Sequence, residues 1–227
     1  LCRCMEFLAT DIICVSAYQR SSLKRKEQVY IIPNAVPKVF VKCLLPDIDT
    51  AFERKRVLML GALKLYKGTL EFICLAGRLP QYSFELVVND TQVNIDRFLV
   101  EHHVGEFSNL KIYPRQTDVA PFYNNASLVL NLSNKEEIIE TFGLTALEAM
   151  SAGLPVIVPT VGGVAEMVEN GVNGYKIDVQ DLDTVEERIK QIFSDKVSYS
   201  MLANNALSSS RKYNEGVMVD NILSHLK

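Results

Sequence analysis

Short apolar runs alternate with helix-like stretches along most of the chain. The apolar runs have the length of buried strands and cover residues 12–15, 29–32, 57–60, 84–88, 110–113, 128–130 and 156–158. Helical stretches between them include residues 68–77, 93–102 and 119–125. Continuous apolar strands separated by helices are typical of a parallel sheet that is covered on both faces. We therefore expect an α/β fold with a doubly wound, Rossmann-like parallel sheet.

In such a sheet, ligands bind beyond the carboxyl ends of the strands. The loops that follow Leu60, Val88, Tyr113, Asn131 and Val158 are therefore the places where a site is expected.

One segment combines acidic residues with helix signals. Glu140 is followed eight positions later by Glu148, in a helix predicted to begin near Thr141 and to stop at Gly153, before a buried strand. At about 1.5 Å of rise per residue, the two carboxylates would lie roughly 12 Å apart, a spacing that suits an elongated ligand. The start of the helix would favour a diphosphate, because its free N–H groups and dipole attract anions. A sugar nucleotide has this shape.

This segment resembles the donor-binding core of the retaining glycosyltransferases of family 4, also called group 1. That family carries Glu-x7-Glu with Phe-Gly after the first Glu, then Gly-Gly-x-x-Glu, then Asn-Gly. This chain has Glu140 to Glu148, then residues 162–166, then residues 173–174. A single Glu pair on a helix is more often a solvated face, but the ordered set is far more specific. The resemblance implies the carboxy-terminal donor domain of the two-Rossmann-domain (GT-B) architecture.

The resemblance also implies roles for individual residues. Glu140 would act in catalysis by holding hydroxyls of the donor sugar and shielding the anomeric carbon. Glu148 would accept hydrogen bonds from the ribose; the alternative is an exposed helix Glu. Glu166 would close the later motif or serve only as an early helix acid favoured by the dipole. The other donor-binding residues of the segment would be Thr141, Phe142, Gly143, Leu144, Gly162 and Gly163, and the last two have the alternative of simple loop glycines.

A second loop, residues 61–68, resembles the family's Gly-Arg-Leu-x-x-x-Lys-Gly element. Cations stabilise a departing diphosphate, so Lys67 matches a catalytic Lys, with Gly61 and Lys64 as donor-binding residues. Lys64 has the alternative of a solvated surface charge. Ala62 stands where the family has Arg, and the loss of a bidentate, always ionised group is not conservative.

Two more segments bear on the site. Asn89 and Asp90 end a strand where the family usually has Gly-x-Gly, and we assign them no role. Residues 113–116 end the next strand and would contact the nucleotide base through the backbone, while Arg115 is equally well interpreted as a surface charge. Residues 131–134 resemble the family's Pro-Ser loop.

Composition excludes several functions. The net charge is −3 and no long basic run occurs, so nucleic acid is not an expected partner. Neither Gly-x-Ser-x-Gly nor a Gly-x-Gly-x-x-Gly after the first strand occurs, which argues against a Ser hydrolase and a nicotinamide enzyme. Cys2 and Cys4 lack a second ligand pair, so we expect no metal site. The resemblance implies a reaction that needs no metal and no other cofactor. Five cysteines, an odd number, favour a reduced cytoplasmic setting. Many members of the family act at the inner face of the membrane, so the resemblance adds this face as a further expected location.

A predicted domain boundary lies at residues 33–37, where two prolines bracket an Asn. On composition this is a plain turn, but the family has a Pro-Asn-Gly-Val element at its domain crossing, and here Ala35 replaces the Gly. Residues 1–33 would then be the tail of a mostly missing amino-terminal acceptor domain, residues 34–51 a connection, and residues 52–227 the donor domain.

The ends of the chain fit the same interpretation. The last helix, including residues 217–226, would cross back to the other domain. The sequence begins at Leu1 rather than Met, so we expect a piece of a longer protein.

The resulting hypothesis is a retaining glycosyltransferase that moves a sugar from a nucleoside diphosphate sugar to an unknown acceptor hydroxyl, in glycan, polysaccharide or glycolipid biosynthesis. The isolated chain should be nearly inactive, because half of the cleft would be absent. Ala62 and the Asn89-Asp90 pair motivate an alternative, a catalytically weak module that binds sugar nucleotides or a partner. A nucleotide-sugar epimerase on the same fold is the third possibility.

Overall fold

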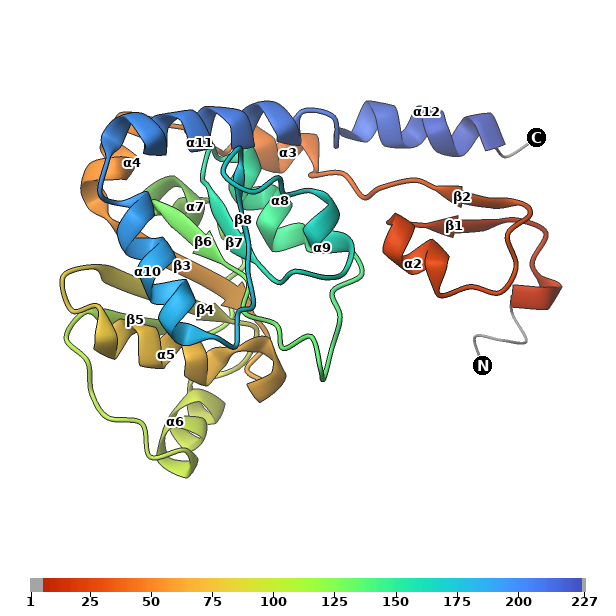
Figure 1. Ribbon diagram of the computed structural model, residues 1–227. Helices are drawn as coiled ribbons and strands as arrows, with labels where there is room; N and C mark the ends of the chain where they lie inside the picture. Colours follow the sequence, from red (N-terminus) through yellow and green to blue (C-terminus); the bar gives the residue numbers. More distant parts are fainter. Residues whose placement is uncertain (1–5, 226–227) are drawn as a thin grey trace.

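A computed structural model describes residues 6–225. Near its start, β1 (Ile12–Cys14) and β2 (Val29–Ile31) form a small parallel pair, joined by α2 (Ala17–Ser21). Figure 1 shows this unit set apart from the main sheet.

The main sheet has six parallel strands in the order β5-β4-β3-β6-β7-β8. The strands are β3 (Arg56–Gly61), β4 (Ser83–Val88), β5 (Leu110–Tyr113), β6 (Leu128–Leu130), β7 (Val156–Val158) and β8 (Gly174–Lys176). The chain first builds outward from β3 to β5 and then returns to place β6 on the other side of β3. The order therefore reverses between β3 and β6, the kind of switch point at which ligands bind in such sheets.

Helices cover both faces of this sheet (Figure 1). The helices from residue 38 onward are α3 (Lys38–Val41), α4 (Ile48–Arg54), the 3₁₀ helix η1 (Leu65–Lys67), α5 (Thr69–Arg78), α6 (Gln92–Glu101), α7 (Ala120–Asn125), α8 (Leu144–Ser151), α9 (Gly163–Glu166), α10 (Leu182–Ile192), α11 (Lys196–Ser210) and α12 (Glu215–His225), and the last of these extends beyond the sheet. The crossover through α5 and the crossover through α8 run in opposite directions along the sheet. Because such crossovers are right-handed, these two helices lie on opposite faces. The predicted doubly wound α/β fold is confirmed.

The core follows from the apolar runs of the sequence. Every residue of β6 and β7 is buried, as are five of the six residues of β4. Strands buried on both faces are expected when helices cover both sides of a sheet. All seven predicted runs form strands, and the three predicted helices appear as α5, α6 and α7.

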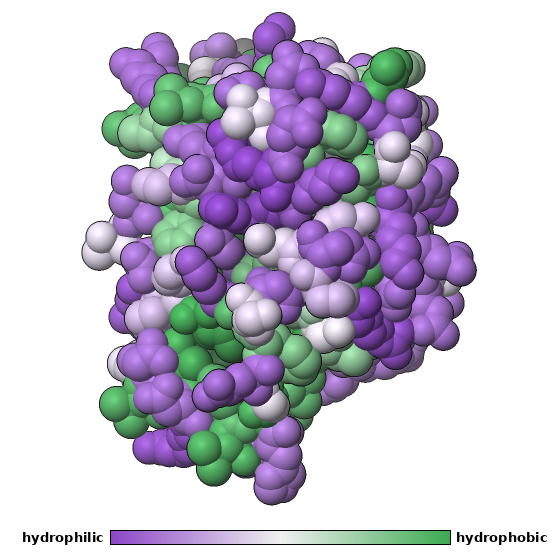
Figure 2. Space-filling model, turned by 90° about the vertical axis from the view of Figure 1, so that its left-hand side faces the viewer, coloured by the Kyte–Doolittle hydropathy of each residue, from purple (hydrophilic) through white to green (hydrophobic). Residues whose placement is uncertain are grey.

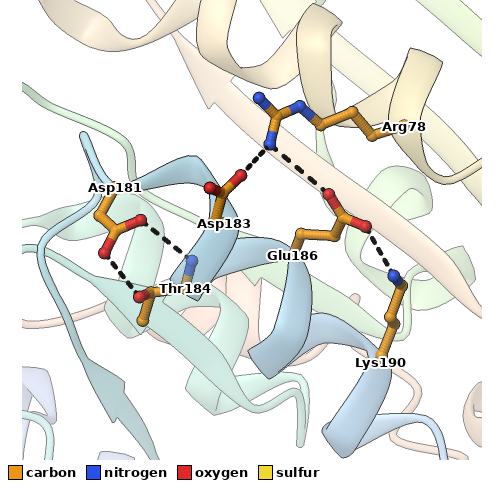
Figure 3. A network of polar contacts seen from close by, with 6 residues as sticks. All are labelled: Arg78, Asp181, Asp183, Thr184, Glu186 and Lys190. Atoms are coloured by element: carbon orange, nitrogen blue, oxygen red, sulfur yellow. Dashed lines mark hydrogen bonds and ion pairs between the residues drawn. The ribbon is translucent and has the colours of Figure 1, made fainter.

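Polar contacts join α5 to α10 at the surface of the main domain (Figure 3). Arg78 of α5 lies 2.6 Å from Asp183 and 3.6 Å from Glu186 of α10. Asp181 caps α10 by accepting hydrogen bonds from the backbone N and the hydroxyl of Thr184. Exposed ion pairs contribute roughly 0 to 1 kcal/mol each. The network therefore contributes little to the stability of the fold.

The predicted domain boundaries can be located in this structure. Val36 donates its backbone N–H to Tyr213, just before α12 begins. Ala35 is not among the described residues with positive φ, so the element does not need the glycine that it lacks. The predicted boundary at residues 51 and 52 falls inside α4, whose Ala51 and Phe52 both belong to the main core.

The carboxy-terminal helix α12 runs from the main domain toward the β1-β2 unit (Figure 1). His225 at its end stacks on Tyr30 of β2, with ring centroids 3.9 Å apart. The chain thus returns to its amino-terminal segment, as expected for residues 217–226; Leu226 itself lies outside the described residues.

Figure 2 shows a mainly hydrophilic face with separate hydrophobic groups, notably at its lower end, the end at which α6 lies in Figure 1. Val93 and Val100 of α6 are 65% and 76% exposed. Scattered exposed apolar side chains are normal at protein surfaces. Across residues 6–225, each helix is too short or too polar to cross a bilayer.

Candidate functional site

A cavity of about 210 Å³ opens at the carboxyl ends of β3 and β6. Its lining includes Glu140, Lys67 and Ser133. One oxygen of the Glu140 carboxylate, Oε1, lies 2.5 Å from Lys67 Nζ and accepts a hydrogen bond of 2.9 Å from Ser133 Oγ. The Glu140 and Lys67 side chains keep 22% and 20% of their surface exposed, so this charged pair is accessible from the cavity.

Tight backbone packing holds Glu140 in place. The N–H of Gly163 donates to the carbonyl of Glu140 at 2.7 Å. A Cβ at Gly163 would lie 1.9 Å from the carbonyl oxygen of Thr141, and one at Gly162 would lie 2.5 Å from that of Glu140. These two glycines do not line the cavity; in this structure they allow α9 to pack against the loop that carries Glu140.

A similar close approach positions Lys67. The next residue, Gly68, has φ of +79°, and a Cβ there would lie 2.3 Å from Cβ of Leu132. Asn134 donates its backbone N–H to the carbonyl of Tyr66 at 2.9 Å, which ties the β6 loop to η1. Lys67 and Glu140 therefore come from two segments, η1 and the loop after β6, that are held together by this hydrogen bond and by close packing.

A second cavity, of about 390 Å³, adjoins the first and contains Glu148. Oε2 of Glu148 accepts a hydrogen bond of 2.6 Å from the hydroxyl of Tyr123, which is fully buried on α7. Burial raises the pKa of Glu148 above its ordinary value, and the bond from Tyr123 partly offsets this. Burial and the nearby carboxylate raise the pKa of Tyr123 well above 10, so its hydroxyl remains a donor.

The two cavities share Leu60, Gly61, Ala62 and Thr145 in their linings. One elongated molecule can therefore extend from the pair at Glu140 to the half-buried carboxylate at Glu148. The common wall lies at the switch point between β3 and β6.

The helix between the two acids begins later than predicted. Gly143 has φ of +92° and precedes α8, which starts at Leu144 rather than near Thr141. The physical reason is the close contact with Val164, since a Cβ at Gly143 would lie 2.5 Å from that side chain. The axial rise that predicted roughly 12 Å between the acids therefore applies to only part of the segment.

This shift changes which backbone groups face the cavity. Gly143, Leu144 and Thr145 line it, at the helix start where N–H groups lack intrahelical partners. Thr141 is exposed, and Phe142 is buried with its ring centroid 5.9 Å from that of Tyr213. Neither of these two lines either cavity.

Three residues of the loop after β3 were predicted to belong to the site, and two of them line the cavities. Gly61 lines both cavities and Lys67 lines the first, whereas Lys64 is exposed and lines neither.

The structure adds several residues that the sequence did not single out for roles. Asn89 and Arg115 line the second cavity, and Arg115 Nε donates to Asn89 Oδ1 at 2.6 Å. Ser133 and Tyr123 bind the two motif carboxylates directly. Asn89 and Arg115 stand at the ends of predicted strands and Ser133 in the segment that resembles the Pro-Ser loop, so only Tyr123 carried no signal in the sequence.

The last motif residues have structural contacts. Asn173 is buried and donates to the carbonyl of Met167 and to Ser209. Gly174 opens β8, and a Cβ there would lie 2.5 Å from the carbonyl oxygen of Val156. Glu166 accepts hydrogen bonds from the first N–H groups of α2 at 3.0 and 2.6 Å.

Other hollows and clusters lack comparable chemistry. Larger hollows of about 550 and 440 Å³ lie beside α11 and beside Tyr213. The first contains the exposed ion pair of Lys196 and Asp49, 3.3 Å apart, and it does not adjoin the carboxyl ends of β3 and β6. Between residues 6 and 225, no three His, Cys, Asp or Glu side chains come together as a metal site requires. Cys2 and Cys4 lie outside the described residues.

Comparison with known proteins agrees with this geometry. A family model described as glycosyl transferases group 1 matches residues 47–209, more than half of the chain. Two uncharacterized glycosyltransferases of Methanocaldococcus jannaschii are 27% and 26% identical over 89% of this chain, which covers 55% and 56% of their lengths. The chain therefore spans about half the length of the curated relatives it matches.

Solved structures match the fold. A crystal structure of Anabaena HepE in complex with UDP and glucose has a TM-score of 0.83 at 22% identity, over 98% of this chain and 64% of that one. At this identity the likeness shows the fold alone, the parallel α/β sheet of GT-B glycosyltransferases. With the family model matching the segment that builds both cavities, the chain belongs to the glycosyl transferases group 1 family.

Proposed function

We propose that this chain is the donor-binding part of a retaining glycosyltransferase. The substrate is a nucleoside diphosphate sugar, and the reaction moves the sugar to an acceptor hydroxyl. The anomeric C–O bond to the diphosphate breaks, a C–O bond to the acceptor forms on the same face, and the acceptor proton leaves with the diphosphate. No protein nucleophile is required.

The observation that carries this proposal is the pair of joined cavities with an acid in each. The sugar would occupy the cavity of Glu140 and Lys67, and the nucleoside the cavity of Glu148. The diphosphate would then lie at their common wall, beside the start of α8, where free N–H groups and the helix dipole favour an anion. The UDP and glucose held by the Anabaena protein are ligands of this class.

Lys67 and Glu140 would change partners when the donor binds. In the structure each neutralises the other. A phosphate oxygen would compete for the Lys67 ammonium, which would stabilise the charge that develops on the leaving group. Glu140 would then be free to accept hydrogen bonds from sugar hydroxyls, with Ser133 keeping its carboxylate oriented.

The proposal includes a reaction that needs no metal ion, because Lys67 and the α8 N–H groups would supply the positive charge. It also places the acceptor on residues outside this chain, since the chain spans about half of its relatives.

A second candidate rests on Ala62. This methyl side chain lies at the common wall, where a cation would be most useful to a leaving diphosphate. A module that binds sugar nucleotides but transfers slowly would tolerate it, whereas a fast enzyme would need another cation.

Nucleotide binding tests the first part of the proposal. Calorimetric titration of the chain with UDP, GDP and ADP, without metal, should show saturable binding of one of them. Glu148→Ala should weaken that binding by about tenfold or more, because hydrogen bonds to a charged group are worth about 1.5 to 3 kcal/mol. Glu187→Ala, which removes an exposed Glu from α10, is the matched control. Equal affinities for all three proteins would contradict the site assignment.

Turnover in the full-length protein tests the second part. Glu140→Gln should lower kcat by about a hundredfold or more, with little change in nucleotide affinity. Glu136→Gln, an exposed position in the same loop, should leave kcat unchanged. The 227-residue chain alone should transfer sugar only at a trace rate. If Glu140→Gln kept normal turnover, the role of Glu140 would be wrong; if all proteins turned over slowly, the binding-module candidate would be favoured.

A further inference from the structure

Few charged side chains line the two cavities, and each cavity has one cation and one carboxylate among its described residues. Among the described residues of the first cavity, the one cation is Lys67, and its charge is paired with Glu140. Among those of the second, the one cation is Arg115 and the one carboxylate is Glu148. The diphosphate of a sugar nucleotide brings further negative charge into a space that already holds two carboxylates. An additional cation with free donors is therefore needed, and Arg115 is the side chain that has them.

Arg115 is held in a defined place by the neighbouring strand. It follows β5, and its backbone N–H donates to the carbonyl of Asp90 at 2.8 Å. Its Nε donates to Asn89 Oδ1 at 2.6 Å, and Asn89 in turn donates its backbone N–H to Gly61 at 2.9 Å. These contacts tie the exposed Arg115 side chain to Asn89, whose backbone contacts the end of β3.

The two terminal nitrogens of Arg115 remain available. Within residues 6–225 they have no hydrogen-bond or ion-pair partner, and only Nε is engaged. A guanidinium fixed through Nε presents its other N–H groups as a planar fork, a geometry that matches the oxygens of a phosphate.

The end of β3 explains why such a cation has room. Ala62 lies in the common wall of both cavities and carries only a methyl group. Lys64, two residues later, is exposed and lines neither cavity. Ala62 and Lys64 therefore bring no charge to the common wall, and Ala62 and Arg115 line the same cavity.

We infer that Arg115, positioned by Asn89, binds the diphosphate of the donor and supplies from β5 the cation that the loop at Ala62 lacks. This inference rests on the proposed function, because it assigns a residue to the same nucleotide. The two unusual features at the ends of β3 and β4 then belong together: the small Ala62 leaves space, and the amide of Asn89 aims a cation into it.

The inference is tested by measuring the affinity for the nucleotide and the affinity for its nucleoside separately. The nucleotide is whichever of UDP, GDP and ADP binds the wild-type chain, and it is titrated beside its own nucleoside, which has no phosphate. Arg115→Ala should weaken diphosphate binding by about tenfold and leave nucleoside binding unchanged. Asn89→Ala should show a smaller loss of the same kind. Lys111→Ala, which removes an exposed cation from the same strand, should change neither affinity.

A rescue experiment separates a specific role of Arg115 from the general effect of removing a positive charge. In the Arg115→Ala background, Ala62→Arg should recover most of the lost diphosphate affinity, because it places a guanidinium on the other side of the same space. Arg115→Lys should recover less, since an ammonium lacks the fork.

Each other outcome has a definite meaning. If Arg115→Ala weakens the nucleoside as much as the diphosphate, Arg115 contacts the base or ribose and the inference is overturned. If neither affinity changes, or if Lys111→Ala has the same effect, the inference is also overturned while the proposed function stands. A wild-type chain that binds none of the three nucleotides would overturn the proposed function, and this inference with it.

Discussion

Tyr123→Phe removes one hydroxyl from the interior of the candidate site and changes little else. Tyr123 is fully buried, and its hydroxyl donates to Glu148 at 2.6 Å. Phe fills nearly the same volume, so the substitution should create almost no cavity. A hydrogen bond to a charged group is worth about 1.5 to 3 kcal/mol. We therefore expect the free energy of unfolding at neutral pH to fall by about 2 kcal/mol, which lowers Tm by about 4 to 8 °C for a chain of this size.

The stability that Tyr123→Phe loses should depend on pH, because the acceptor of the lost hydrogen bond is the Glu148 carboxyl. Burial raises the pKa of this carboxyl, and the bond from Tyr123 acts in the opposite direction. Without that bond the pKa of Glu148 in the folded state rises further, so the variant loses most stability above this pKa, where the carboxylate is ionised. As the pH falls through it, the lost bond becomes one between neutral groups, and the loss should shrink to about 1 kcal/mol.

Tyr199→Phe is the matched control. Tyr199 is also fully buried, but its hydroxyl donates to the backbone carbonyl of Ser127 at 2.8 Å, and that acceptor does not titrate near neutral pH. The control should lose about 1 kcal/mol at every pH. Thermal unfolding followed by circular dichroism at about pH 8 and about pH 4 measures both variants. Equal, pH-independent losses would refute the reasoning, because Tyr123 would then not bind an ionised Glu148.

Three further predictions concern the same segment. Gly163→Ala should lower the free energy of unfolding by about 1 to 3 kcal/mol in urea titrations, because its Cβ would lie 1.9 Å from the Thr141 oxygen; Gly105→Ala, in open space, should change it by less than about 0.5 kcal/mol. Glu148→Gln should raise Tm at neutral pH, and the gain should vanish as the pH falls toward 4.5, because a buried carboxyl with a raised pKa destabilises the fold only when ionised. Glu166→Gln should speed amide exchange in α2 several-fold by weakening charge-assisted hydrogen bonds; unchanged exchange would show that this carboxylate does not hold the helix.

The sheet could be predicted because its strands are buried on both faces. The runs of β6 and β7 contain only apolar residues, and Glu85 alone interrupts the predicted run of β4, so the apolar runs identify these strands. The strand β8 was not predicted. Its three residues, Gly174–Lys176, contain a single apolar side chain, and the strand exists because Gly174 packs on Val156 and because β7 offers a free edge.

The site could be predicted only in part. The resemblance located both acids and Lys67, and these do line the joined cavities. The start of α8 was wrong because Gly143 turns the chain against Val164, a contact between distant segments that no local pattern shows. Ser133 lies in the segment that resembles the Pro-Ser loop, but its hydrogen bond to Glu140 was not predicted, and Tyr123 was missed altogether, for the same reason.

The Gly-Gly-x-x-Glu motif illustrates how a pattern attributed to ligand binding can have a physical cause in packing. Gly163 approaches Thr141 so closely that any side chain would displace the loop of Glu140, and its missing Cβ would also lie 2.8 Å from Cβ of Ser16. One helical turn later, Glu166 accepts the first N–H groups of the helix that Ser16 caps. The motif thus joins the loop of the candidate catalytic acid to the amino-terminal segment. Any movement of that segment relative to the main sheet would reach Glu140 through a few contacts, so the geometry of the cavity that Glu140 and Lys67 line should depend on the placement of residues 12–31.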